Sequence, residues 1–208
     1  MSPLVSAVFL TPPPISPLYK RPTMITDEVP YWYVLRDLRR ANAKRPAYLD
    51  LEEGPYGLEH KVFVPMRQRV ILRGGKRVIE TVPFMTDLIF VHESREVLDP
   101  IIHVLPTLQY RFARGCRQND PMKVRNEEME QFIRAVHSHR DVRYFTPDEV
   151  SPLLYGKNIR IIGGALDGYE GRLMSKRGSK TRRLIIQIEG LIAAAIEVEP
   201  QFVQLIPD

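Results

Sequence analysis

Residues 156–208 constrain the fold most strongly, because they hold five short apolar runs and no helical periodicity. Runs of this length that end at turn residues are typical of the strands of a small β-barrel, whose closure leaves no free sheet edge. A unit of about fifty residues buries little apolar area, so we expect it to be only marginally stable alone. The runs are "KNIRIIG", "GRLMSKR", "RRLIIQIE", "AAAIEVE" and "FVQLI".

The chain before this unit mixes strand and helix patterns. "YWYVLRDL" from Tyr31 predicts a core strand that opens the fold, and "NAKRPAYLDLEEG" predicts a short helix with Asn42 as its N-cap and Gly54 as its end. "HKVFVPM" and "TDLIFVH" predict further strands. Because side chains alternate along a strand, we expect Leu88 and Phe90 to share one face of the last of these.

A hairpin and two longer helices complete this part. "RQRVILR" and "KRVIETV" flank Gly74 and Gly75, which supply the positive φ that a tight hairpin turn requires. "SREVLDPIIHVL" predicts a helix capped by Ser94, and "RNEEMEQFIRAVHS" predicts the clearest helix, capped by Asn126. With a strand at "TLQYRFAR", the elements indicate an α+β sandwich. The apolar face of the clearest helix comprises Met129, Phe132, Ile133 and Val136.

Proline content and periodicity divide the chain into segments. Residues 1–29 contain three consecutive prolines and no basic stretch before their apolar patch, which predicts a disordered Pro-rich N-terminal arm rather than a signal peptide. We expect a first domain at 30–142, a linker at 143–155 where prolines interrupt the pattern, and a second domain at 156–208. No stretch approaches the roughly 18 apolar residues that span a bilayer. The single cysteine, Cys116, excludes an internal disulfide and favours a cytoplasmic location.

Positive charge is concentrated in one part of the chain. The net charge is +5, but residues 33–77 hold eleven basic and five acidic residues, whereas residues 78–150 hold nine basic and twelve acidic residues. A localised positive field of this kind favours a partner that carries phosphates.

Several motifs in a fixed order carry a family resemblance. They are "WYVLR" before a helix, a basic hairpin, "PFMTDLIFV", "GKNIRIIGGALDGYEGRL" and "EGLIAAAIEVEPQFVQLI". Over residues 31–206 the chain resembles NusG-type transcription elongation factors, in which an NGN domain with an α/β sandwich precedes a small all-β, SH3-like KOW barrel. With "DPMKVRNEE", the two-domain layout is most similar to the UpxY-type antiterminators encoded with polysaccharide operons.

The glycine-rich stretch "RIIGGALDGYEG" at 160–171 could turn a strand or cradle a phosphate. A phosphate-binding P-loop requires Gly-Lys-Ser/Thr at a set offset, and "RGSKT" has the wrong order. In the KOW motif that the chain resembles, the glycines let the chain reverse between two strands, which is a steric requirement. These glycines are Gly163, Gly164, Gly168 and Gly171.

The resemblance implies that an apolar surface of the NGN domain binds the clamp helices of RNA polymerase. Large, flexible apolar side chains suit a groove for a partner helix, although each of them could instead belong to the core. The family pattern has Pro-Gly where this chain has Thr86 and Asp87, so the local backbone path is expected to differ. The polymerase-binding candidates are Phe84, Met85, Leu88, Tyr31 and Trp32.

The same resemblance implies that basic side chains contact the non-template DNA strand or the nascent RNA. A solvated charged face is the alternative for any single residue. The candidates around the first helix are Arg36, Arg39, Arg40, Lys44 and Arg45, and those on the hairpin are Arg67, Arg69, Arg73, Lys76 and Arg77.

In the KOW barrel, the resemblance implies an apolar tip that contacts a ribosomal protein of the NusE type or the Rho terminator. Glu189 stands where a bulky apolar residue is common, and its carboxylate would be costly to desolvate, so we expect no recruitment of Rho. The matching positions are Tyr169, Ile188, Glu189 and Leu191.

No pattern in the chain predicts an enzyme, a metal site or a cofactor. His137 and His139 are two residues apart, which does not place two imidazoles on one helix face toward zinc. Asp148 and Glu149 are adjacent on a loop, which gives no acid–base pair, and Cys116 has no evident base. We therefore expect a monomeric antitermination or elongation factor that acts by binding. The alternative is a ribosome- or RNA-associated protein in which the KOW barrel does the main work.

Overall fold

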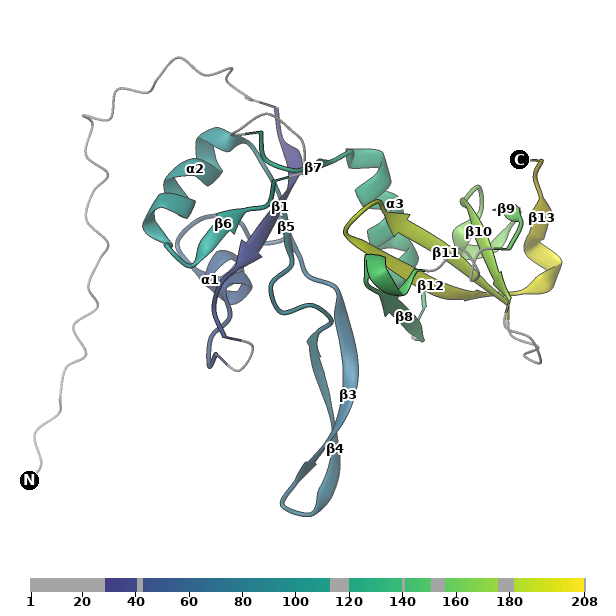
Figure 1. Cartoon of the computed structure of the whole chain (residues 1–208), viewed down its shortest axis with the longest axis horizontal. Helices are drawn as coiled ribbons and strands as arrows, with labels where there is room; N and C mark the ends of the chain where they lie inside the picture. Colours follow the sequence, from purple (N-terminus) through teal and green to yellow (C-terminus); the bar gives the residue numbers. More distant parts are fainter. Residues whose placement is uncertain are drawn as a thin grey trace, which may run out of the picture.

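The computed structural model describes residues 29–40, 43–112, 120–139, 141–150, 156–175 and 182–207 (Figure 1). The predicted arm up to residue 28, the predicted cap Asn42, Cys116 and linker residues 151–155 lie outside the described residues. In the described part, three α-helices combine with two larger sheets and a separate hairpin. This composition confirms the expected mixture of helices and strands.

The first sheet is built around a buried central strand, β1 (Tyr31–Asp37). β1 pairs antiparallel with β5 (Ile89–Glu93) along one edge, and with β6 (Leu108–Tyr110) and β7 (Lys123–Val124) along the other. The short strand β2 (Val62–Phe63) extends the sheet beyond β5. The aromatic and β-branched run of β1 thus lies in the middle of the sheet, where both of its faces can be covered.

Helices cover both faces of this sheet (Figure 1). α1 (Ala47–Glu53) and α2 (Arg95–Val104) pack on the face that carries Tyr33, Leu35, Ile89 and Val91. α3 (Asn126–His137) packs on the opposite face, among Trp32, Val34, Leu88 and Phe90. Leu88 and Phe90 therefore share one side, as the alternation predicts.

The N-termini of the helices are capped differently from the prediction. α3 starts at Asn126 with Arg125 at the N-cap position, so Asn126 is not the cap. Ser94 does occupy the N-cap of α2, but its side chain makes no capping hydrogen bond. At α1 the backbone N–H of Ala47 donates to the carboxylate of Asp37 over 2.8 Å. A buried carboxylate from β1 therefore replaces a local cap at that helix.

β3 (Met66–Arg73) and β4 (Lys76–Pro83) form a separate two-stranded hairpin. Gly74 and Gly75 make the turn with φ of 57° and 78°, which confirms the predicted requirement for positive φ at both positions. Figure 1 shows the hairpin extending away from the rest of the protein.

The second sheet contains six antiparallel strands in the order β13-β9-β10-β11-β12-β8. The five predicted runs correspond to β9 to β13, whereas β8 lies in the segment expected to be a linker and pairs with β12. Pairing among the described residues does not join β13 to β8. The strands are β8 (Val142–Phe145), β9 (Asn158–Ile161), β10 (Glu170–Ser175), β11 (Arg182–Ile188), β12 (Ile192–Val198) and β13 (Val203–Leu205), with short 3-10 turns η1 (Pro147–Glu149), η3 (Gly164–Leu166) and η4 (Pro200–Phe202).

The glycine-rich turn joins β9 to β10. Gly163, Gly164 and Gly168 have φ of 89°, 73° and 80°, so these three let the chain reverse. Gly171 serves a different purpose, because a Cβ there would lie 2.6 Å from the carbonyl oxygen of Ile185. The Gly163 N–H donates to the carboxylate of Asp167, so this backbone donor is already occupied.

α3 joins the two sheets into one packed body. It contacts β1 on one side and β11 and β12 on the other, and Figure 1 shows it between them. Its buried residues Met129, Phe132, Ala135 and Val136 belong to a single apolar cluster with Trp32 and Phe90 of the first sheet and Leu184, Ile186 and Ile196 of the second. Below, the N-terminal unit is the described part of residues 29–139, and the C-terminal unit is that of residues 141–207.

Candidate partner-binding cleft and nucleic-acid interface

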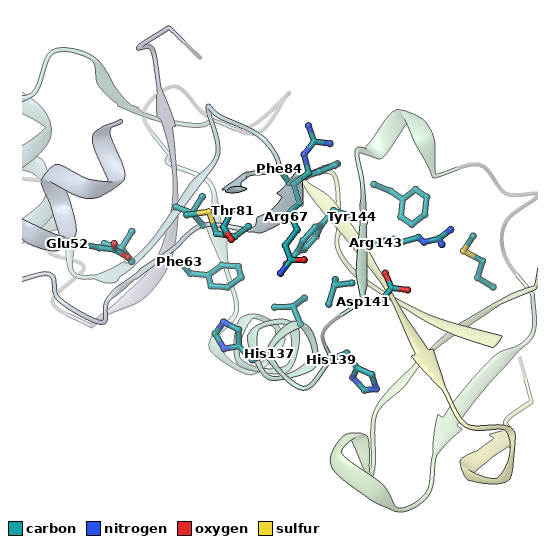
Figure 2. Close-up of a pocket in the computed structure, with 18 residues that line it drawn as sticks. Glu52, Phe63, Arg67, Thr81, Phe84, His137, His139, Asp141, Arg143 and Tyr144 are labelled. Carbon is teal, nitrogen blue, oxygen red and sulfur yellow. The ribbon is translucent and has the colours of Figure 1, made fainter. Parts of the chain in front are cut away.

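An open cleft of about 1120 Å³ lies between the two units, next to Phe84 (Figure 2). One wall comes from the N-terminal unit, through Phe63 of β2 and the root of the hairpin. The other wall comes from β8, and α3 contributes Val136 and His137. The hairpin root contributes Met66, Arg67, Gln68 and Thr81, and the second wall contributes Asp141, Val142, Arg143, Tyr144 and Phe145.

Several aromatic rings contact neighbouring side chains around this cleft. The Phe84 ring lies 5.4 Å from the Tyr144 ring between centroids, and the Arg67 guanidinium lies 5.4 Å from the Phe84 centroid. Phe63 contacts Phe132 of α3 edge-on, with centroids 6.2 Å apart. Burial raises the pKa of Tyr144 to about 12, so its phenol is neutral near pH 7. The two units therefore meet at Phe84 through a pair of neutral rings, with the Arg67 guanidinium over the Phe84 ring.

The predicted polymerase-binding residues do not form one surface. Phe84 lines the cleft, and Met85 is half-buried against the same apolar cluster. Leu88 is fully buried, so it belongs to the core. Trp32 borders a smaller hollow with Phe63, Ile133 and His137.

Tyr31 lies apart from these residues. Because successive side chains of a strand point to opposite faces, Tyr31 and Trp32 cannot line the same surface, contrary to expectation. Tyr31 is exposed, and its ring centroid lies 4.9 Å from the Lys123 ammonium.

Asp87 has a structural role at the end of the loop before β5. Its carboxylate accepts a hydrogen bond from Arg111 over 2.8 Å and lies 3.4 Å from Arg36. Arg36 is therefore partly neutralised by a neighbour that sequence reasoning did not connect with it.

Acidic side chains also neutralise part of the predicted basic cluster near α1. The Asp50 carboxylate lies 2.7 Å from Arg39 and also pairs with Arg45, which pairs in turn with Glu53. Burial alone would raise the pKa of Asp50, but hydrogen bonds from Arg45 and Arg39 lower it overall. Arg40 and Lys44 differ, because no ion pair involves them among the residues that the structure describes.

On the hairpin, most of the predicted basic side chains face solvent. Arg69 lies 3.2 Å from Glu80, while Arg67 lies over the Phe84 ring. Arg73, Lys76 and Arg77 at the tip are exposed and have no ion pair within the described ranges. The net positive field of the N-terminal unit is therefore strongest along this hairpin.

The predicted partner residues of the C-terminal unit are mostly covered. Tyr169, Ile188 and Leu191 are buried in the apolar cluster that includes α3, whereas Glu189 is exposed on a turn. The hydroxyl of Tyr169 is buried without a hydrogen-bond partner, and burial raises its pKa. An unpaired buried hydroxyl weakens the packing that covers it.

Sequence reasoning missed several residues of the cleft, namely Phe63, Met66, Tyr144 and Phe145. The run Val142–Phe145 did carry a strand signal, because it contains two aromatic residues and a β-branched one before a proline. Arg183 of β11 is buried, and its guanidinium donates to the Asp141 carboxylate over 2.7 Å.

Two further features of the described residues concern metal binding and membrane spanning. Across the described ranges, no group of three or more His, Cys, Asp and Glu side chains is placed to hold a metal ion. The His139 ring nitrogen Nδ1 is 2.7 Å from the Ser138 hydroxyl, and His137 contacts Phe63. No helix in the described part is both long and apolar enough to cross a membrane.

Comparison with known proteins places this architecture in a family. The family described as "NusG: Transcription termination factor nusG" matches residues 30–133, which is half of the 208-residue chain. The match runs from the start of β1 into α3, and so contains the first sheet, the hairpin and Phe84. A comparison with curated proteins found no match. The chain belongs to the NusG family.

Proposed function

We propose that this protein is a transcription elongation or antitermination factor that binds RNA polymerase through the cleft beside Phe84. The observation that carries the proposal is the coincidence of the NusG family match with a cleft, lined in part by aromatic side chains, at the position where the family resemblance implies polymerase binding. The mechanism is binding alone, so the chain makes and breaks no covalent bond.

The side chains of the cleft suit a helical partner. Phe63, Met66 and Phe84 present aromatic and thioether groups that can adapt to the apolar stripe of a helix. We propose that this partner is the pair of clamp helices of RNA polymerase. Arg67 at the edge would meet acidic side chains on those helices and would raise the rate of association more than the final affinity.

We propose that the C-terminal unit is a KOW module and that it competes with RNA polymerase for the surface around Phe84. Tyr144 contacts the Phe84 ring, and β8 forms one wall of the cleft. A helix pair that reaches Phe84 must therefore displace Tyr144, so binding requires the units to separate at this wall. The unpaired hydroxyl of Tyr169 favours separation, because water can solvate it once α3 moves away.

Separation would also expose the partner site that we propose for the KOW module. Tyr169, Ile188 and Leu191 would become available to a second protein, for which a ribosomal protein of the NusE type is our candidate. Glu189 is exposed beside them, and its carboxylate disfavours an apolar pocket such as that of Rho. Linked binding at two sites would raise the effective concentration of the second partner.

For nucleic acid, we propose the non-template DNA strand or nascent RNA as the ligand of the exposed cations. Arg40, Lys44 and the hairpin residues Arg73, Lys76 and Arg77 carry this role better than Arg39 and Arg45, whose charges are paired with Asp50. Phosphate contacts of this kind weaken as salt concentration rises. Control of one dedicated operon, as in UpxY-type factors, is part of the same proposal.

Transcription through a terminator in vitro tests this function. The wild-type protein should increase readthrough by purified RNA polymerase, and Phe84→Glu should abolish the increase, because a charge cannot be buried against an apolar helix. Phe112→Glu is the matched control, since Phe112 is an exposed phenylalanine that does not line the cleft. Equal readthrough with Phe84→Glu and Phe112→Glu would favour the ribosome-associated alternative. Ribosomal RNA as the main species that co-purifies with the protein would favour the same alternative.

A further inference from the structure

The β3–β4 hairpin is an arm whose root contacts the rest of the protein through Met66 and Arg67 and whose tip is exposed. Each strand has eight residues, which at about 3.3 Å per residue gives an arm roughly 26 Å long. Its strands pair only with each other, and Figure 1 shows the tip far from both units. A two-stranded ribbon is marginally stable in water, so an arm of this length gains most from a surface on which it can lie.

One face of this arm carries exposed aliphatic side chains, with Arg77 beside them near the tip. Directly opposite residues share a face, and Val70 faces Ile79 while Leu72 faces Arg77. Val70, Leu72 and Ile79 are 62%, 74% and 66% exposed. We call these three residues the apolar face of the hairpin.

The opposite face carries most of the positive charge of the arm. The register places Arg67, Arg69, Arg73 and Lys76 together on this side, with Ile71 and Val78 between them. Glu80 pairs with Arg69 and is the only acidic residue of the hairpin. We call the four cations the basic face.

The apolar face continues into the cleft. Met66, Gln68 and Thr81 lie on the same side of the ribbon as Val70 and Ile79, nearer the root, and all three line the cleft beside Phe84. Arg67 of the opposite face lines the cleft as well, so a partner seated in the cleft would reach the apolar face beside this one cation.

Composition decides which class of partner fits the apolar face. Residues 66–83 contain no aromatic side chain, whereas proteins that bind bases of single strands stack them on aromatic rings. Branched aliphatic side chains suit the apolar centre of a protein interface instead. A second copy of this chain is disfavoured, because two such arms would bring their arginines together.

We propose that the apolar face of the hairpin is a second docking surface for RNA polymerase, on an apolar patch with an acidic rim that adjoins the surface bound in the cleft. The basic face then remains free for phosphates, so one arm contacts protein on one side and nucleic acid on the other. This inference rests on the proposed function, because it takes the partner in the cleft to be polymerase.

Two sets of substitutions separate the faces. The first set, Val70→Thr with Leu72→Thr and Ile79→Thr, keeps or adds β-branched residues and removes apolar area from one face. The second set, Arg69→Gln with Arg73→Gln and Lys76→Gln, is the matched control on the other face. Both sets lie outside the core. A thermal melt of the single variant Leu72→Thr checks that substitution on the arm does not disrupt the fold.

Binding to core RNA polymerase and to a single-stranded DNA oligonucleotide is measured for the full chain and each variant. The threonine set should weaken polymerase binding by about tenfold or more and leave DNA binding unchanged. The glutamine set should weaken DNA binding and flatten its salt dependence. Unchanged polymerase affinity in the threonine set overturns the inference, and a loss of DNA affinity instead assigns the apolar face to bases. If Phe84→Glu abolishes polymerase binding while the threonine set does not, the proposed function stands and only this inference fails. If the wild-type chain does not bind polymerase, both fail.

Discussion

Replacing Tyr144 by alanine should make the protein bind RNA polymerase more tightly, although the substitution removes contacts from the free protein. Tyr144 is half-buried, and its ring lies 5.4 Å from that of Phe84 across the boundary between the units. An aromatic pair contributes about 0.5–1.5 kcal/mol beyond the area it buries. With the buried ring area added, the contact stabilises the closed arrangement by about 1–3 kcal/mol.

The expected change in affinity follows from this magnitude. Each 1.4 kcal/mol changes an equilibrium about tenfold, so loss of the Tyr144 ring should raise the population in which Phe84 is accessible by about tenfold or more. If the closed form predominates, the apparent affinity for polymerase rises by up to the same factor. Equilibrium binding to core polymerase measures the change, and small-angle X-ray scattering of the free protein should show a larger radius of gyration.

Val150 provides the control for this experiment. It packs against the cluster of Ile185, Ala193 and Ala195 within the C-terminal unit and does not line the cleft. Val150→Ala should therefore destabilise that unit without releasing Phe84 and leave polymerase affinity unchanged. If Tyr144→Ala binds polymerase no more tightly than the wild type, competition between Tyr144 and polymerase for Phe84 is refuted.

The remaining predictions concern stability. Gly171→Ala should destabilise the protein by about 2–3 kcal/mol through overlap with the backbone of β11, whereas Gly190→Ala, at φ of 71° in open space, should cost only about 1 kcal/mol, as urea denaturation can measure. Asp37→Ala should cost about 2–4 kcal/mol, because the N–H groups of Ala47 and Arg39 lose their shared acceptor, and exposed Asp148→Ala should be neutral in the same assay. Because burial raises the pKa of Tyr144 to about 12, the stability that its neutral phenol contributes is complete below about pH 10 and is lost as the pH rises through 12. An alkaline titration followed by tyrosinate absorbance should show a tyrosine that ionises near pH 12 in the wild type and lacks this step in Tyr144→Phe. Identical titrations of the two proteins would contradict the raised pKa of Tyr144.

Local patterns predicted the elements of the fold well. Alternation in "TDLIFVH" placed Leu88 and Phe90 on one face, and the adjacent glycines Gly74 and Gly75 identified the hairpin. Both features depend on residues close in sequence, where backbone geometry is set by sterics. β8 was missed although its aromatic and β-branched residues carry a strand signal, because the prolines that follow it favoured a linker and its partner strand β12 lies some fifty residues later in the chain.

The candidate site was harder to predict because it depends on tertiary neighbours. The sequence shows the charges of Arg39 and Arg45 but does not show that Asp50 pairs with both. Tyr169, Ile188 and Leu191 read as an exposed apolar tip, yet α3 and the second sheet cover them. An apolar residue near a turn carries no local signal of which surface will cover it.

Photo-crosslinking from position 84 identifies the molecule that binds at Phe84. A photoreactive phenylalanine analogue replaces Phe84 in the full chain, which is then mixed with RNA polymerase and irradiated. We expect a crosslink to the clamp helices of RNA polymerase, with a higher yield when Tyr144→Ala is combined with the analogue. Crosslinks that form only within the chain to β8, at the same yield with and without polymerase, would contradict the claim that polymerase binds at Phe84.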